Sequence, residues 1–230
     1  MSPACRVAAG ADRKGKEDRV SDSTLEVIRH PLIEHKLSYM RDRRTQPAEF
    51  KELLDQITLL MTFHVTSGFE GDEVSVETPL ETTRARRIRE DRLVVVPILR
   101  AGLGMLEAVR KLVPGARVGH LGFYRNEETL EPVRYYGNLP PHTGNSAFLL
   151  LDPMLGTGGT AAAAVAELKA HGATDIRVMC VVASPEGAAH MTARHPDVPV
   201  YTAALDRQLN AVGYIVPGLG DAGDRVFGTS

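Results

Sequence analysis

A change of hydrophobic period between residues 147 and 172 constrains the fold of this chain more than any other feature. Ala147–Leu151 is a continuous apolar run, which is typical of a strand buried on both faces of a parallel sheet. Ala161, Val165 and Leu168 then recur at helical spacing, and Gly172 follows as a stop signal. A loop of small residues separates the two patterns, so the segment predicts a strand, a loop and a helix in succession.

The loop between this strand and this helix has the composition of an anion cradle. Gly156, Gly158 and Gly159 lack a Cβ, so the backbone can approach a ligand closely. Thr157 and Thr160 add hydroxyls, and the free N–H groups of the following helix point into the same space. These features predict a phosphate site, although a glycine-rich turn that serves tight packing has the same composition. The loop is neither a Walker A sequence nor a GxGxxG sequence.

Asp152 ends the predicted strand, at the edge where open α/β sheets bind their ligands. A carboxylate beside a phosphate would repel it, so we expect Asp152 to accept hydrogen bonds from sugar hydroxyls instead. A vicinal diol next to a phosphate describes a ribose phosphate, which is the class of ligand that the segment predicts.

Strand-like and helical segments alternate along the rest of the chain. Apolar strands are predicted near residues 74–76, 93–99, 118–124, 176–183 and 198–203, and this alternation indicates a mainly parallel sheet. Residues 1–23 lack periodicity and predict a mobile tail, which leaves a single domain over residues 24–230. The arginine-rich stretch 84–92 predicts a helix with a solvated basic face, and a polyphosphate effector site is the alternative.

Composition argues against several classes of protein. The 27 basic and 29 acidic residues give a net charge of −2, which does not indicate a nucleic-acid binder. Cys5 and Cys180 cannot build a disulfide framework or a metal site, and Cys180 lies in an apolar run that predicts a buried, inert thiol. The chain has no apolar run of membrane-spanning length and no signal-peptide pattern, so we expect a cytoplasmic protein without a membrane partner.

Three other features of the chain offer ligand-binding residues. Arg100 follows a predicted strand and precedes two glycines, where its guanidinium suits either a diphosphate or a structural salt bridge. Arg125 lies among charged residues and, by composition alone, fits a solvated ion-pair cluster. Residues 213–225 contain four glycines and no helical or strand period, and a loop of that length inside a domain is usually functional.

Four segments together resemble the uracil phosphoribosyltransferases, a branch of the type I phosphoribosyltransferase superfamily. They are residues 97–105, 124–132, 152–160 and 213–227, and the resemblance runs from about Val27 onward. Pro153 stands where many members of the superfamily have a second acidic residue, and this departure is similar to the uracil branch. Gly156 and Thr160 replace the more common Ala and Ser, which keeps size and hydroxyl chemistry close.

This resemblance implies a type I phosphoribosyltransferase-like α/β fold, in which helices flank a central, mainly parallel sheet. A hood built from N- and C-terminal segments and an extended β-arm would complete it. The implied reaction transfers the 5-phosphoribosyl group from phosphoribosyl diphosphate (PRPP) to N1 of uracil, giving UMP and diphosphate in pyrimidine salvage. Mg²⁺ would arrive bound to the diphosphate, without a metal site in the protein. A homodimer or a higher homo-oligomer and, in some members, activation by GTP are implied as well.

The resemblance also assigns roles to individual residues. Catalytic roles would belong to Arg100, Asp152 and Asp221. The PRPP site would comprise Arg100, Arg125, Asp152, Pro153, Met154, Leu155, Gly156, Thr157, Gly158, Gly159, Thr160 and Asp221. The uracil site would comprise Ile215, Gly220, Asp221 and Ala222.

Two alternatives to this activity stay open at the level of the sequence. One is a phosphoribosyltransferase that uses another base. The other is a regulator of the same fold that senses nucleotides and binds RNA, although the near-neutral charge argues against RNA.

Overall fold

The computed structural model describes residues 24–125, 131–141 and 144–229, with only the backbone of Arg125. The predicted mobile tail, residues 1–23, lies outside this range. The centre of the fold is a nine-stranded sheet in the order β1-β11-β10-β8-β4-β6-β7, with β5 beside β4 and β9 beside β10. Its strands are β1 (Leu25–Val27), β4 (Leu93–Leu99), β5 (Arg117–Val118), β6 (His120–Arg125), β7 (Pro132–Asn138), β8 (Ala147–Leu151), β9 (Met154–Leu155), β10 (Asp175–Ala183) and β11 (Val200–Leu205).

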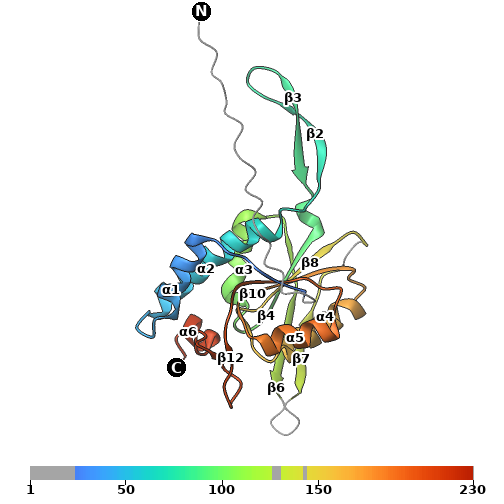
Figure 1. Cartoon of the computed structure of the whole chain (residues 1–230). Helices are drawn as coiled ribbons and strands as arrows, with labels where there is room; N and C mark the ends of the chain where they lie inside the picture. Colours follow the sequence, from blue (N-terminus) through green and yellow to red (C-terminus); the bar gives the residue numbers. More distant parts are fainter. Residues whose placement is uncertain (1–23, 126–130, 142–143, 230) are drawn as a thin grey trace, which may run out of the picture.

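Helices cover both faces of this sheet (Figure 1). One face carries α1 (Pro31–Arg41), α2 (Pro47–Val65), α3 (Leu103–Leu112) and α6 (Ala222–Phe227), and the other carries α4 (Gly159–Ala170) and α5 (Pro185–Arg194). Every pairing in the sheet is parallel except that of β6 with β7. The expected fold class, a mainly parallel sheet flanked by helices, is confirmed. None of the helices in the described ranges is long and apolar enough to cross a bilayer.

The uninterrupted apolar strands follow from this two-sided burial. Successive residues of a strand point to opposite faces, so Leu149 and Leu151 of β8 pack under α2 and α3 while Phe148 and Leu150 pack under α4 and α5. The α2 side is built on a helical stripe that begins after Pro47, and its members Phe50, Leu54, Ile57 and Met61 are fully buried.

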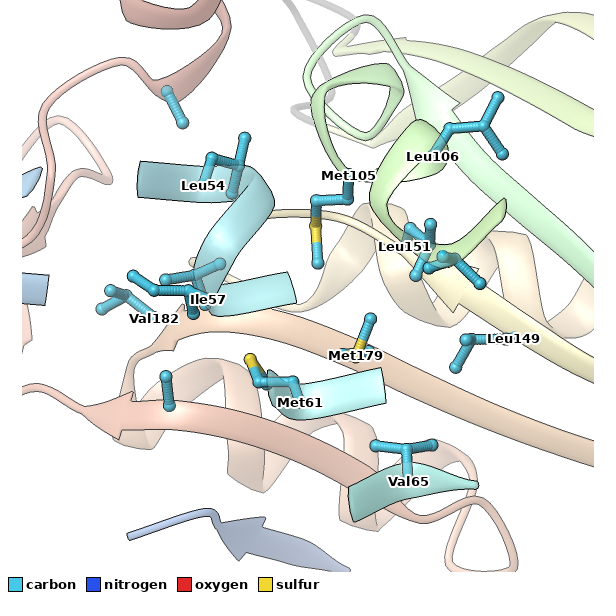
Figure 2. Packing of buried hydrophobic residues seen from close by; sticks show 14 of the residues in the cluster. Leu54, Ile57, Met61, Val65, Met105, Leu106, Leu149, Leu151, Met179 and Val182 are labelled. Carbon is cyan, nitrogen blue, oxygen red and sulfur yellow. The ribbon is translucent and has the colours of Figure 1, made fainter. Parts of the chain in front are cut away.

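A close view of this core shows how the layers meet. Ile57 and Met61 of α2 and Met105 of α3 lie over Leu151 of β8 and Met179 of β10 (Figure 2). Each such side chain contributes about 1.5–3 kcal/mol by its removal from water. The core therefore fixes β8, whose carboxyl end precedes Asp152, against α2 and α3.

The arginine-rich stretch differs from the prediction. Residues 82–88 form β3 (Thr82–Ile88), which pairs with β2 (Gly71–Glu77) in a hairpin that projects from the body (Figure 1); only Glu90–Arg92 makes one 3₁₀ turn. The helix predicted there is wrong because both faces of the hairpin are largely exposed, which leaves no hydrophobic period to reveal the strand. Cross-strand pairing supports it instead, including an ion pair of Arg84 with Glu73 at 2.9 Å.

The order of the strands places a ligand crevice at one end of the sheet. The helix after β4 packs on one face and the helix after the neighbouring β8 packs on the other, so the chain turns in opposite directions from these two strands. Their carboxyl ends, which precede Arg100 and Asp152, form the switch point at which open α/β sheets bind ligands. On the other side of β4, β6 pairs antiparallel with β7 in a hairpin.

Candidate active site

The glycine-rich segment that was predicted to bind an anion lies between β8 and α4, and it is called the cradle here. Gly158 caps α4 with a φ of +78°, a conformation that glycine adopts without strain. The first hydrogen bond of the helix runs from the Ala162 N–H to the Gly158 carbonyl at 2.9 Å. The N–H groups of Gly159 and Thr160 precede that bond, so they have no acceptor within the helix and can bind an anion at its positive end. The strand, loop and helix expected here are confirmed.

The outer wall of the cradle is tied to β10 and α5 through its carbonyl groups. The Pro153 carbonyl accepts the N–H groups of Val181 and Val182 at 3.0 and 3.1 Å. Ser184 donates its N–H to the Leu155 carbonyl at 3.0 Å and its hydroxyl to the Gly156 carbonyl at 2.6 Å. Because these carbonyl groups accept hydrogen bonds from β10 and Ser184, their oxygens are directed away from a phosphate bound in the loop.

Gly187, which follows Ser184 in the first turn of α5, packs against the same cradle. A Cβ on Gly187 would lie 2.2 Å from the Gly156 carbonyl oxygen, so no larger residue fits there without moving the loop. The Ser184 hydroxyl also accepts the Gly187 N–H at 2.9 Å, as an N-cap does. One serine thus caps α5 and fixes the cradle.

Asp152 lies between the cradle and the core and is desolvated by the atoms packed around its carboxyl. Burial raises the pKa of Asp152 to about 7, and the Met154 N–H, which donates to Oδ1 at 3.3 Å, opposes this rise in part. Among the described residues, this N–H is the one hydrogen-bond donor to the carboxyl, which can accept further bonds. Hydroxyl donors of a ribose would restore hydrogen bonds to the charged form and lower its pKa.

Arg100 follows β4, and Gly102, two residues later, packs directly on β8. A Cβ at Gly102 would lie 2.4 Å from the Leu151 carbonyl oxygen. The Arg100 guanidinium donates to Asp224 of α6 at 3.3 Å, and more than half of its side chain remains exposed. The structural salt bridge considered from the sequence is therefore present, but an exposed pair of this kind contributes little to stability and can exchange for a diphosphate.

A hollow of about 220 Å³ joins the cradle to the C-terminal segment. It is lined by Met154 and Gly156 from the cradle side and by all four predicted base-site residues, Ile215, Gly220, Asp221 and Ala222. Gly220 has a φ of +74°, and its backbone faces open space, because a Cβ at this position would have no atom closer than 3.9 Å. The lining residues are Ala101, Met154, Gly156, Gly213, Tyr214, Ile215, Gly220, Asp221, Ala222 and Gly223.

The C-terminal segment is more regular than its sequence indicates. β13 (Ile215–Val216) pairs with β12 (Gln208–Leu209), and Asp221 caps α6 by accepting the Asp224 N–H at 2.9 Å. The expectation of an irregular loop over residues 213–225 is corrected in this respect. Elements of two and six residues are too short to leave a period in the sequence.

Arg125 is the predicted PRPP residue whose side chain lies outside the described part of the structure. Its backbone ends β6 and pairs with Pro132 of β7. A Cβ on Gly159 would lie 3.8 Å from Pro132, so this end of the hairpin stands directly beside the cradle. The structure therefore brings the backbone of Arg125 to the mouth of the crevice.

Several residues around this crevice were not identified from the sequence. Ala101, Gly213, Tyr214 and Gly223 line the hollow, and they adjoin or fall within segments that the sequence did single out. No feature of the sequence marks Gly187 as part of the site. Ser184 is recognisable as a helix cap, but its bond to Gly156 spans 28 positions and follows only from the fold.

Comparison with known proteins agrees with this architecture. The adenine phosphoribosyltransferase of Trypanosoma brucei, solved with AMP, pyrophosphate and ribose-5-phosphate, superposes with a TM-score of 0.52 at 15% identity, over 80% of this chain and 84% of that one. The chain thus has the type I phosphoribosyltransferase fold. The AQ2163 protein of Aquifex aeolicus is more similar, with a TM-score of 0.85 and 36% identity over 90% of this chain and 99% of that one.

Relatives in sequence narrow the class to one family. The family model for uracil phosphoribosyltransferase matches residues 27–229. The uracil phosphoribosyltransferase of Geobacillus kaustophilus is 52% identical over 203 residues, and that of Bacillus licheniformis is 53% identical over the same length. Each alignment covers 88% of this chain and 97% of the relative. This chain belongs to the uracil phosphoribosyltransferase family.

Proposed function

We propose that this enzyme transfers the 5-phosphoribosyl group from PRPP to N1 of uracil, giving UMP and diphosphate. The observation that carries the proposal is the hollow of about 220 Å³ that unites the cradle with the segment around Gly220. A ribose phosphate anchored at the start of α4 would present its anomeric carbon to that hollow. A pyrimidine ring held by the C-terminal segment would then face it.

The reaction needs placement and charge stabilisation more than covalent chemistry. The bond from C1′ to the diphosphate oxygen breaks and its electron pair leaves with the diphosphate, the bond from C1′ to N1 of uracil forms, and the N1 proton is released to water. Positive charge builds on the ribose in the oxocarbenium-like transition state. Asp152 and Asp221 would stand beside this charge and the ribose hydroxyls, while Arg100 and Arg125 would hold the departing diphosphate.

Specificity for uracil would come from backbone groups in the C-terminal segment. Uracil presents an acceptor–donor–acceptor edge, and the open backbone of Gly220, between Ile215 and Ala222, can offer complementary groups. Cytosine has an amino donor in place of one acceptor. A fixed N–H at that point would face another donor, and both would stay unpaired in a desolvated site.

We also propose that Mg²⁺ enters as a complex with PRPP. Asp152, a single carboxylate beside the cradle, suits a hydrated ion that takes most of its oxygens from phosphates. When bound, the ion would neutralise charge on the diphosphate.

A homodimer or larger assembly is a further proposal. It rests on membership of the uracil phosphoribosyltransferase family. Activation by GTP and a cytoplasmic location are proposed from family membership, and the free Cys180 thiol is compatible with a reducing compartment.

Diphosphate release with uracil, cytosine, hypoxanthine and orotate in turn tests the proposed activity. Turnover with uracil alone is the expected result. Turnover with a different base would support the first alternative, and turnover with none would support a regulator. Repeating the assay with GTP and with a chelator tests activation and the need for Mg²⁺, and light scattering measures the assembly.

A further inference from the structure

A buried ion pair connects α1 to the segment that lines the proposed base site. Asp206 directly follows β11 and is 7% exposed. Arg41, the last residue of α1, binds both of its carboxylate oxygens, with Nη1 at 2.8 Å from Oδ2 and Nη2 at 2.6 Å from Oδ1. This two-point geometry is the strongest that an arginine and a carboxylate can adopt.

Both partners of the ion pair also bind the backbone of Gly218. Asp206 Oδ2 accepts the Gly218 N–H at 2.8 Å, and Arg41 Nη1 donates to the Gly218 carbonyl at 2.9 Å. The two peptide groups that flank the Gly218 Cα are therefore held at the same time. Gly220, which faces the hollow, lies only two residues further along the chain.

A second arginine holds the next residue in the same way. Arg225 of α6 donates to the Leu219 carbonyl at 3.0 Å, and it binds the carbonyls of Met40 and Asp42 at the end of α1 at 2.8 and 2.7 Å. Its guanidinium lies 4.3 Å from the centre of the Phe50 ring. Residues 218 and 219 are thus attached to α1 by side-chain hydrogen bonds.

Hydrogen bonds of this kind matter here because packing does not determine the loop conformation at Gly220. Gly218 and Gly220 both have positive φ, and glycine has the widest choice of backbone conformation. A Cβ on Gly220 would meet no atom closer than 3.9 Å. A buried ion pair is in itself weak evidence for stability, because apolar residues of similar volume serve stability as well or better. What apolar residues cannot supply is the orientation of the Gly218 peptide groups.

We propose that Arg41 and Asp206 are positioning residues for the base, which set the orientation of the backbone that reads uracil. The proposal rests on the proposed function of the C-terminal segment. It predicts that loss of Arg41 weakens use of the base and leaves use of PRPP intact, because the cradle is attached to β10 and α5 instead.

The test compares Arg41→Met with Arg177→Met as a matched control. Arg177 has a similarly buried side chain, 19% against 24% exposed, pairs with Asp175 and donates to the Val65 carbonyl at 2.7 Å, but it lies at the amino end of β10. In Arg41→Met the KM for uracil is expected to rise about tenfold, the equivalent of one charge-assisted hydrogen bond, with the KM for PRPP within about twofold. Arg177→Met is expected to change neither KM.

Arg41→Met leaves Asp206 buried without its partner, which alone can lower stability. The double variant Arg41→Met/Asp206→Asn removes that charge and keeps an acceptor for the Gly218 N–H. Its thermal midpoint is expected to recover toward the wild-type value while the KM for uracil stays raised. A KM that recovered together with stability would overturn the proposal.

Amide hydrogen exchange over residues 215–222 measures the same effect without any substrate. Exchange in this segment is expected to be at least about tenfold faster in Arg41→Met and unchanged in Arg177→Met. Unchanged exchange, or an equal rise of both KM values, would refute the positioning role. A wild type that used a base other than uracil would contradict the proposed function alone, and the KM comparison would then be made with that base.

Discussion

Substitution of Gly187 by alanine tests whether α5 shapes the phosphate cradle from behind. The alanine Cβ would lie 2.2 Å from the Gly156 carbonyl oxygen and 2.7 Å from that of Leu155, whereas ordinary contact begins at 3.4 Å. The two groups must therefore separate by about 1.2 Å. Both neighbours are backbone atoms, so the cradle itself has to move. Overpacking of this kind costs about 1–3 kcal/mol of stability.

The effect on catalysis follows from the size of that displacement. A misplacement of about 1 Å in a binding site can cost about 100-fold in rate, so kcat/KM for PRPP is expected to fall by about that factor in Gly187→Ala. Diphosphate release at varied PRPP measures it, and urea unfolding measures stability. Gly68→Ala is the control, because a Cβ there meets nothing within 4 Å. A Gly187→Ala enzyme with kcat/KM within about threefold of the wild type would refute the reasoning.

Three other predictions address the cradle and the base site. The raised pKa of Asp152, about 7, means that the folded chain binds an extra proton between about pH 4 and 7 and loses stability as pH rises through that range. Asp152→Asn is therefore expected to be more stable than the wild type at pH 8 by at most about 4 kcal/mol and to lose this advantage near pH 4. Its turnover is expected to be poor. If the difference in stability measured by urea unfolding did not vary with pH, the raised pKa of Asp152 would be contradicted. Both Asp221→Asn and Asp221→Ala remove the carboxylate, and turnover is expected to fall about 100-fold in each. Asparagine can still cap α6 and alanine cannot, so the free energy of unfolding is expected to fall by about 1 kcal/mol only in Asp221→Ala. Wild-type rates in these variants and in Gly220→Val would remove this segment from the site. Gly158→Val places a β-branched residue at φ +78° with its Cβ 2.8 Å from the Gly187 carbonyl oxygen, and calorimetry is expected to show no PRPP binding; unchanged affinity would disprove the cradle.

The parts of the fold that local pattern encodes were predictable. The apolar run of β8, the glycine-rich loop and the start of α4 follow one another within a few residues, and each leaves its own signature. The same holds for the stripe of α2 after Pro47. In the β2–β3 hairpin, Val74 and Val76 marked β2, but β3 left no such signal, because its exposed faces carry threonine and arginine rather than alternating apolar residues.

The sequence by itself determined which chemical groups are present and where each strand delivers them: a carboxylate, a cradle of small residues and a glycine-rich segment. Tertiary structure alone decided what surrounds them. Arg41 meets Asp206 across 165 positions, and Ser184 reaches Gly156 across 28. The pKa of Asp152 rises because packing removes water from its carboxyl, and the adjacent residues in the sequence do not reveal this burial. Side-chain type and local period are properties of adjacent residues, whereas desolvation and hydrogen-bond partners depend on segments that only the folded chain brings together.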